Sequence, residues 1–367
     1  MRIINRLTIF NFGLAVASVY MFTINCVAQE HNNATNLFQT SIQESDSNSD
    51  SDKLWLTFQG QGGPGKGKTI VLISGDDEYR SEQTMPMLGK ILAVHHGFDC
   101  HVLFAIEPET GTVKPDYQTN IPGMELLDQA DLIILGLRFR NLPDKEMKHF
   151  VDYVESGKPI IGTRTSTHAF NYPKDSESQY KHYGFNSTSW EGGFGQQVLG
   201  DTWISHHGKH RKESCRGVIE NGKQDHPILK GVTDVWGPSD VYGIRNLPES
   251  ANILMRGAVL EGMAPDDQPV KGKKNDPMMP IAWTKSYDSQ AGVKSKIFCT
   301  TMGASTDFES AGLRRLVVNA AYWCLGLEDK IPAKSNADYV DEYRPTEFGF
   351  GTFQKGLTPS DYDMKSK

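Results

Sequence analysis

The sequence has no excess of positive charge and only one long apolar run. Its 38 Lys and Arg residues are outnumbered by 45 Asp and Glu residues, which gives a formal net charge of -7. A nucleic-acid partner requires a basic face that neutralises phosphates, so we expect no nucleic-acid partner. After residue 28, no segment reaches the roughly 20 apolar residues that cross a bilayer. We therefore expect no stable membrane insertion once the first 28 residues are removed.

Cysteine is scarce, with five residues in a chain of 367. A chain of this length does not need disulfides to stabilise its core. Cys26 lies in the N-terminal apolar run, and the other four are Cys100, Cys215, Cys299 and Cys324. The last two lie in a predicted strand and a predicted helix, which favours small, buried apolar side chains. The sequence leaves the pairing of these four cysteines open.

The N-terminus has the pattern of a secretory signal. Arg2 and Arg6 precede an apolar stretch over residues 7–27, and the small residues Cys26 and Ala28 stand just before a polar segment. The pattern predicts cleavage after Ala28 and an exported protein, periplasmic or secreted. The alternatives are a lipoprotein modified at Cys26, although the residues before this cysteine fit a lipidation site poorly, and an uncleaved membrane anchor.

The rest of the chain divides into three parts by composition. Residues 29–66 are rich in Ser, Asp, Asn, Gln and Gly, which predicts a flexible polar linker because such a segment buries too little apolar surface to fold. Residues 67–330 contain the periodic apolar patterns of a folded domain. Residues 331–367 form a tail with aromatic residues among glycines, which we expect to pack along the domain surface, with a partner site as the alternative.

Short apolar runs alternate with helical patterns in the folded part. The run Ile70-Val71-Leu72-Ile73 is continuous and rich in β-branched residues, as in a strand buried on both faces. Strands are predicted at residues 70–73, 98–106, 131–137, 159–163, 253–260, 281–283 and 296–301, and helices at 84–95, 143–154 and 313–325. This alternation predicts an α/β fold with a mostly parallel sheet and helices on both faces. Residues 171–252 form a long irregular insertion, and such insertions are usually functional.

Reactive side chains follow four of the predicted strands, and the last of these strands is followed by Ser305 and Thr306. In open parallel sheets, ligands bind beyond the carboxyl ends of the strands. Asp76 and Glu78 follow the first strand, Arg138 follows the third, and Arg164 and His168 follow the fourth. Their convergence predicts a site at this edge, and a salt-bridged rim that only orders loops is the alternative.

Several motifs resemble the trehalose-utilisation (ThuA-like) family, and their order and spacing over roughly residues 69–326 carry the resemblance. They are Ile160-Ile161-Gly162-Thr163-Arg164 with His168 and Phe170, Leu199-Gly200 followed by His206, His226-Pro227-Ile228, Asp240-Val241-Tyr242, Pro280-Ile281-Ala282-Trp283-Thr284 and Phe298-Cys299-Thr300-Thr301-Met302-Gly303. The resemblance implies a class I glutamine amidotransferase-like fold, which is a flavodoxin-like three-layer sandwich. It also implies an activity in carbohydrate or keto-sugar metabolism.

Two departures from related proteins restrict the chemistry. Amidotransferases need a nucleophilic Cys in a tight strand-to-helix turn, and the comparable turn here, residues 162–165, contains none. Many family members carry a His directly after the glycine of the last strand, where this chain has Ala304. We therefore expect no glutamine amidotransferase activity. A serine hydrolase is not expected either, because no G-x-S-x-G motif surrounds Ser166 or Ser305.

The insertion contains a dense group of histidines, Ser205-His206-His207-Gly208-Lys209-His210. With His168, Cys215 and Asp240, these residues could bind a divalent metal such as zinc. The spacing matches no closed structural zinc motif, so hydrogen-bonding or acid/base histidines and a purely structural role are alternatives. His206 is the best single metal ligand because its position matches the family.

The hypothesis from the sequence is an exported enzyme that acts on a small-molecule sugar as a hydrolase, lyase or isomerase. We expect His168 or Asp240 to be the acid/base group and Arg164 to clamp the substrate or an oxyanion. The expected substrate-binding residues are Asp76, Glu78, Arg138 and Tyr242. The alternative is a non-catalytic carbohydrate-binding or scaffold domain, and a redox or amidotransfer activity would require a reactive thiol.

Overall fold

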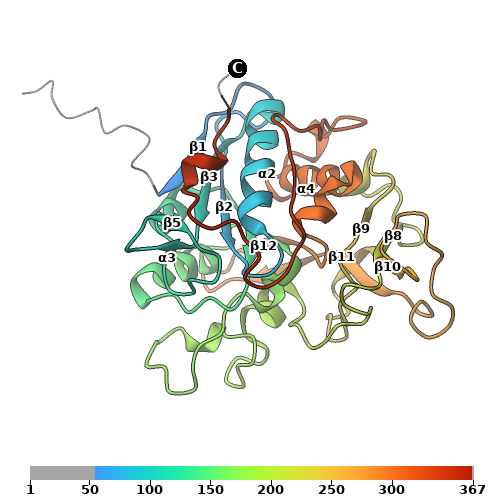
Figure 1. Ribbon diagram of the computed structural model, residues 1–367, viewed down its shortest axis with the longest axis horizontal. Helices are drawn as coiled ribbons and strands as arrows, with labels where there is room; N and C mark the ends of the chain where they lie inside the picture. Colours follow the sequence, from blue (N-terminus) through green and yellow to red (C-terminus); the bar gives the residue numbers. More distant parts are fainter. Residues whose placement is uncertain (1–53, 366–367) are drawn as a thin grey trace, which may run out of the picture. The chain divides into compact units, whose positions relative to one another are not determined.

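A ten-stranded sheet organises residues 54–365, the part of the chain that is described in a computed structural model (Figure 1). The strand order is β1-β3-β2-β6-β7-β12-β11-β10-β8-β9. The bounds are β1 Trp55–Phe58, β2 Thr69–Gly75, β3 Asp99–Phe104, β6 Leu132–Leu137, β7 Ile160–Thr163, β8 Cys215–Ile219, β9 Trp236–Gly237, β10 Asn252–Val259, β11 Met279–Asp288 and β12 Lys294–Thr300. A separate pair consists of β4 Ile106–Glu107 and β5 Thr112–Val113.

Five neighbouring strands, β3-β2-β6-β7-β12, are parallel to one another. Their sequences are nearly continuous apolar runs because both faces of these strands are covered. In chain order this arrangement is the 2-1-3-4-5 order of flavodoxin-like folds, with the change of direction between β2 and β6. The predicted α/β, flavodoxin-like fold is therefore confirmed.

Antiparallel strands extend the parallel centre on both sides. β1 pairs with β3 at one edge, and β11, β10, β8 and β9 continue from β12 at the other. β11 and β12 are joined by only five residues, which allows a hairpin but not a parallel crossover. The sequence did not predict this antiparallel extension.

Helices cover both faces of the parallel centre. The α-helices are α2 Ser81–His96, α3 Asp144–Glu155 and α4 Ala311–Cys324, and the short helices are η2 Met124–Gln129, η3 Arg164–His168, η4 Lys181–Tyr183, η5 Gly195–Leu199, η6 Pro227–Leu229, η7 Ser305–Glu309, η8 Glu328–Lys330 and η9 Pro359–Tyr362. Leu72 of β2 shares one core cluster with α2 and α4, whereas Ile73 shares the other with η2 and α3. Successive side chains of a strand point to opposite faces, so these clusters define three layers.

Two expected boundaries are wrong. The expected linker extended to residue 66, but Trp55–Phe58 forms β1 and pairs with β3. Leu56 and Phe58 point inward and are buried. Because the side chains of a strand alternate between its two faces, two apolar residues are enough to bury one face of this short edge strand. The helix expected at residues 84–95, with Thr84 as its cap and Pro86 in its first turn, begins at Ser81 as α2, so Pro86 lies inside the helix. The expected signal and the rest of the expected linker lie outside the described residues.

The C-terminal tail packs back over the domain. Tyr339 and Tyr343 lie against the core cluster that contains α2 and α4, and Tyr362 stacks on Phe104 with 5.6 Å between ring centroids. Figure 1 shows the tail crossing in front of the layer formed by α2 and α4. Among the described residues, no helix has both the length and the apolar character needed to span a bilayer.

Candidate functional site

The carboxyl ends of β2, β6, β7 and β12 lie at one edge of the sheet because these strands are parallel. The loop after β2 carries Asp76 and Glu78, the loop after β6 carries Arg138, and η3 after β7 carries Arg164 and His168. The change of strand order lies between β2 and β6, and ligands of flavodoxin-like folds bind in the crevice at such a point. The predicted convergence of these loops therefore occurs where the fold places binding sites.

Arg164 occupies the tight turn between β7 and η3. Its φ of 44° lies in the left-handed region, which costs an ordinary L-residue energy and often marks a functional turn. Gly303, after β12, approaches so closely that a Cβ atom there would lie 3.1 Å from the Cβ of Arg164. The turn thus has the strained geometry of a nucleophile elbow, but it presents an arginine.

The Arg164 guanidinium is buried, and both of its terminal nitrogens donate hydrogen bonds. Nη1 donates to the backbone carbonyls of Asp240 (2.6 Å) and Thr301 (2.8 Å), and Nη2 donates to the Tyr79 hydroxyl and to Asp240 Oδ1, both at 3.0 Å. The guanidinium carbon lies 4.3 Å from the ring centroid of Tyr79 and 3.9 Å from that of Tyr242. With 1% of its surface exposed, Arg164 holds Asp240 in place.

Asp240 lies at the centre of the site, and each of its carboxylate oxygens has an imidazole nitrogen within hydrogen-bonding distance. His206 Nδ1 lies 2.7 Å from Oδ2, and His210 Nδ1 lies 3.1 Å from Oδ1. The two loops are joined by backbone bonds, since His207 and the adjacent Gly208 donate to the carbonyl of Val241. The sequence-predicted pair His206 and Asp240 is therefore brought together, and His210 joins it.

The electrostatics of the cluster favour an ionised Asp240. Burial alone would raise the pKa of this carboxyl, but hydrogen bonds from His206 and His210 and the charge of Arg164 outweigh burial and lower the pKa. Asp240 is therefore negatively charged at neutral pH. It can hold a cation or orient an imidazole, but it is poorly suited to supply a proton.

Asp76 and Glu78 differ in what they contact. Asp76 accepts from the backbone N–H groups of Glu78 and Tyr79 and from the Thr165 hydroxyl, so it fixes the loop after β2 against η3. Glu78 Oε1 lies 3.2 Å from His210 Nε2, which links this loop to the histidine cluster. Burial raises the pKa of both carboxyls.

Arg138 lies at the rim of the same edge. Its Nη1 donates to Asp77 Oδ1 at 2.8 Å, and Nη2 lies 3.7 Å from Glu78 Oε2. The guanidinium carbon also lies 4.6 Å from the ring centroid of Phe350. Arg138 is less buried than Arg164, with 14% of its side chain exposed, so it is the better placed of the two arginines to meet a ligand.

His168 lies beside the cluster in an aromatic environment. Its ring centroid is 5.3 Å from that of Trp203, 5.2 Å from that of Phe139 and 6.1 Å from that of Tyr242. Burial, together with the charges of Arg138 and Arg164, lowers the pKa of His168 well below its ordinary value. The ring is therefore neutral at pH 7 and carries a lone pair, while the lowered pKa makes it a weak base.

The tail completes the site, which the sequence did not predict. Phe348 is buried and lies 5.2 Å from Tyr79 and 5.7 Å from His210, measured between ring centroids. Gly349 N donates to the carbonyl of Glu78, which fastens the tail to the loop after β2. Phe350 is 60% exposed beside Arg138. No local pattern could reveal these contacts, because they join residues far apart in the sequence.

Ala304, which follows Gly303 after the end of β12, brings no titratable side chain to the site. Ala304 is buried in a small cluster with Tyr79 and Phe348. Asp307, three residues later, accepts from the backbone N–H groups of Gly303 and Ala304 and from the Ser239 hydroxyl. Asp307 thus ties the end of β12 to the segment that carries Asp240.

The four described cysteines are buried and unpaired. They are Cys100, Cys215, Cys299 and Cys324. Burial raises the pKa of each of these thiols, and a reactive cysteine instead needs a lowered pKa and access. Within the described part of the chain, no thiol is prepared for amidotransfer or redox chemistry.

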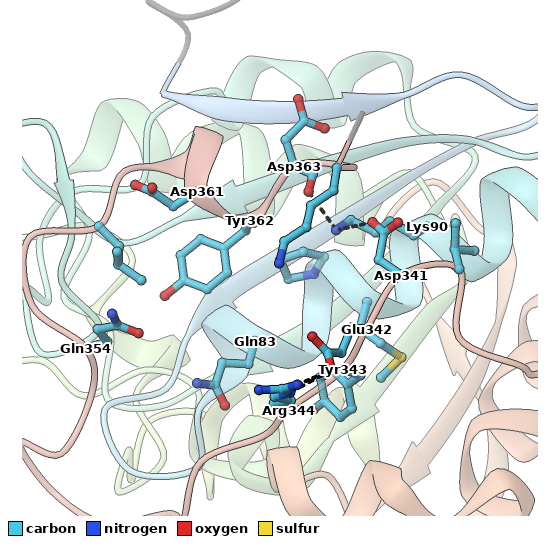
Figure 2. A pocket seen from close by; sticks show the side chains of 15 residues that line it. Gln83, Lys90, Asp341, Glu342, Tyr343, Arg344, Gln354, Asp361, Tyr362 and Asp363 are labelled. Atoms are coloured by element: carbon cyan, nitrogen blue, oxygen red, sulfur yellow. Dashed lines mark hydrogen bonds and ion pairs between the residues drawn. The ribbon is translucent and has the colours of Figure 1, made fainter. Parts of the chain in front are cut away.

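A cavity of about 290 Å³ lies elsewhere, between α2 and the tail (Figure 2). It is lined by Gln83, Lys90, Tyr343, Arg344 and Tyr362, among others. Lys90 pairs with Asp341 across it. None of its lining residues belongs to the cluster around Asp240, so this cavity is a feature of tail packing that is separate from the candidate site.

Fold and site together define an α/β domain with flavodoxin-like strand order and a polar cluster at its switch point. A family model described as "ThuA: Trehalose utilisation" matches residues 109–324, which is more than half of the chain. The chain therefore belongs to the ThuA family, as its motifs predicted.

The solved structures that are similar to this chain include two ThuA-like proteins. A ThuA-like protein from Parabacteroides merdae is 15% identical with a TM-score of 0.44, and the match covers 82% of this chain and 100% of that one. A ThuA-like protein from Bacteroides uniformis is 16% identical with a TM-score of 0.43, covering 71% of this chain and 92% of that one. No curated protein matches the chain significantly.

Proposed function

We propose that this chain is an exported enzyme of carbohydrate metabolism that acts on a sugar or keto sugar at the cluster around Asp240. The observation that carries the proposal is the convergence of His206, His210 and Arg164 on both oxygens of one buried carboxylate. Such a group is costly to bury, and it lies at the switch point of the sheet, where the fold places ligands. Membership in a family described by trehalose utilisation supports a sugar as the ligand.

The surroundings suit a sugar. His206 is exposed over 37% of its side chain, so a ligand reaches the cluster from its side. Phe350 offers an exposed ring, and Arg138 and Glu78 offer a donor and an acceptor for hydroxyl groups. Trp203 Nε1 is a buried donor without a hydrogen-bond partner among the described residues. Ligand pockets combine aromatic walls with a few such polar groups.

The roles of the predicted residues follow from their contacts. Arg164 is a positioning residue, because its terminal nitrogens already donate hydrogen bonds to the carboxylate and the backbone carbonyl of Asp240, to the carbonyl of Thr301 and to the Tyr79 hydroxyl. Asp240 is the anionic centre, and the neutral His168 is the proton acceptor. Hydrolysis, elimination and isomerisation of a sugar all require proton transfer next to a C–O bond, so the geometry supports the broad class rather than one reaction.

The experiment is a combined binding and turnover assay with the full-length protein. Trehalose, its keto derivative and other saccharides are followed by calorimetry for binding and by NMR for products. His168→Gln should lower turnover by about 10²–10⁴-fold, the usual contribution of a proton-transfer group. His207→Ala is the control, because its Nε2 bonds to the carbonyl of Lys274 and not to the cluster.

A non-catalytic carbohydrate-binding domain is the second candidate. The arginine at the elbow and Ala304 at the end of β12 favour it, because neither supplies a nucleophile or an acid. Sugar binding without any product would establish this second function. A protein that neither binds nor converts any saccharide would contradict both proposals.

A further inference from the structure

We propose that His206, His210 and Asp240 form a binding site for one divalent transition-metal ion, with zinc as the ion to test. One ligand atom from each residue lies within 4.8 Å of the others. Two imidazole nitrogens and a carboxylate oxygen are the donors that zinc takes in catalytic sites, where three protein ligands leave a fourth position open. Of the three histidines at residues 206–210, His206 and His210 face Asp240 and His207 does not.

The hydrogen bonds around His210 support an ion between these residues. Its Nε2 faces Glu78 Oε1 at 3.2 Å while its Nδ1 faces Asp240 Oδ1 at 3.1 Å. A neutral imidazole carries one N–H and one lone pair, so one of these contacts would be repulsive without a second proton or a cation. With the N–H on the Glu78 side, the Nδ1 lone pair is free for a metal. This is the carboxylate–histidine–metal arrangement of many zinc proteins.

Asp240 is prepared as a ligand in the same way. Arg164 Nη2 donates to Oδ1 and fixes the carboxylate, while Oδ2 faces His206. The carboxylate is buried beside the Arg164 guanidinium, so a divalent ion on Oδ2 would bind to a ligand that is already held in place. Ligands held by outer hydrogen bonds of this kind are oriented before the metal arrives.

The environment would leave the ion accessible from one side only. The rings of Trp203 and Tyr242 each lie 5.7 Å from His206, and Phe348 lies 5.7 Å from His210. His206, in contrast, is the exposed member of the cluster. An ion here would be shielded from water on one side by these aromatic rings and would have an open coordination position toward solvent, as a metal that binds substrate requires.

The inference deepens the proposed function but does not depend on it for its test. If the substrate is a sugar or keto sugar, the ion supplies a Lewis acid that polarises a carbonyl or hydroxyl oxygen. Arg164 and Glu78 would then act as positioning residues for Asp240 and His210. The ion itself can be measured without any substrate.

The test is a titration of chelator-treated, full-length protein with zinc chloride alone, by calorimetry, with circular dichroism as the check on folding. We expect one ion per chain. His206→Ala and His210→Ala should each weaken binding at least about 100-fold, and Glu78→Gln should weaken it about 10–100-fold because it removes the outer partner of His210. His207→Ala is the matched control from the same loop and should bind zinc like the wild type.

The outcomes separate this inference from the proposed function. No zinc binding by the wild type, or binding that persists unchanged in the His206 and His210 variants, overturns the metal site. A metal-free protein that still converts a sugar would leave the proposed function intact. A protein that binds zinc through this cluster but neither binds nor converts any saccharide would retain the metal site and contradict the proposed function.

Discussion

Arg164 and Asp240 should be strongly coupled in stability, because the structure makes Arg164 an internal support for that carboxylate. The perturbation is Arg164→Met, which keeps a long unbranched side chain and a non-glycine residue at φ 44°. The backbone strain is therefore the same in both proteins. The difference in the free energy of unfolding then reports the loss of the guanidinium alone.

The magnitude follows from burial. Arg164 is 1% exposed and makes four hydrogen bonds, two of them to Asp240. Removing one partner of a buried ion pair costs about 3–5 kcal/mol, because it leaves the other charge uncompensated. Asp240→Asn should be destabilising for the same reason. The double variant should cost about 2 kcal/mol less than the sum of the single variants, which is within the range for residues in contact.

The assay is urea denaturation of all four proteins, followed by tryptophan fluorescence and circular dichroism. Coincidence of the two signals tests whether unfolding is two-state, which matters for a chain of 367 residues. If the effects of Arg164→Met and Asp240→Asn add within about 0.5 kcal/mol, the two residues are independent. That result would refute the role of Arg164 as the support of Asp240.

Three further predictions concern pH, the tail and export. Burial raises the pKa of Glu82 to about 7 from 4.5, so the folded state retains a proton that the unfolded chain releases. The free energy of unfolding should therefore fall from pH 5 to pH 8, by at most about 3 kcal/mol. In urea denaturation, the stability of Glu82→Gln relative to the wild type should increase over the same range. A difference between the two proteins that stays constant with pH would contradict the pKa shift. Phe350→Ala should leave unfolding unchanged, because the ring is 60% exposed, but should weaken sugar binding about fivefold by calorimetry, and equal affinities would exclude the ring from the site. Mass spectrometry of the exported protein should find cleavage after Ala28, whereas a lipid on Cys26 would show the alternative processing.

The sequence predicted the parallel centre of the fold because each of its strands is a local signal. Residues 131–137 were expected as a strand, and β6 spans Leu132–Leu137. β1 was missed because its four residues follow a long polar segment and carry no turn signals of their own. The start of α2 was misplaced because Thr84 resembles a cap, whereas the helix follows Arg80, whose φ is 61°.

The site was predictable only in part. Arg164 follows from strand topology, and His206 and Asp240 follow from the order of the family motifs. The link from Glu78 to His210 and the position of Phe348 depend on loops that meet in space, so no periodicity encodes them. The burial of Arg164 between Tyr79 and Tyr242 is a tertiary property as well, and it changes the expected role of this arginine.

The most direct test of the proposed sugar site around Asp240 is a crystal structure of the protein soaked with the saccharide that binds most tightly. We predict density for the sugar at the carboxyl edge of the sheet, with its oxygen atoms next to His206 and Asp240 and a ring face against Phe350. Density confined to the cavity between α2 and the tail (Figure 2), with the cluster around Asp240 untouched, would contradict the account.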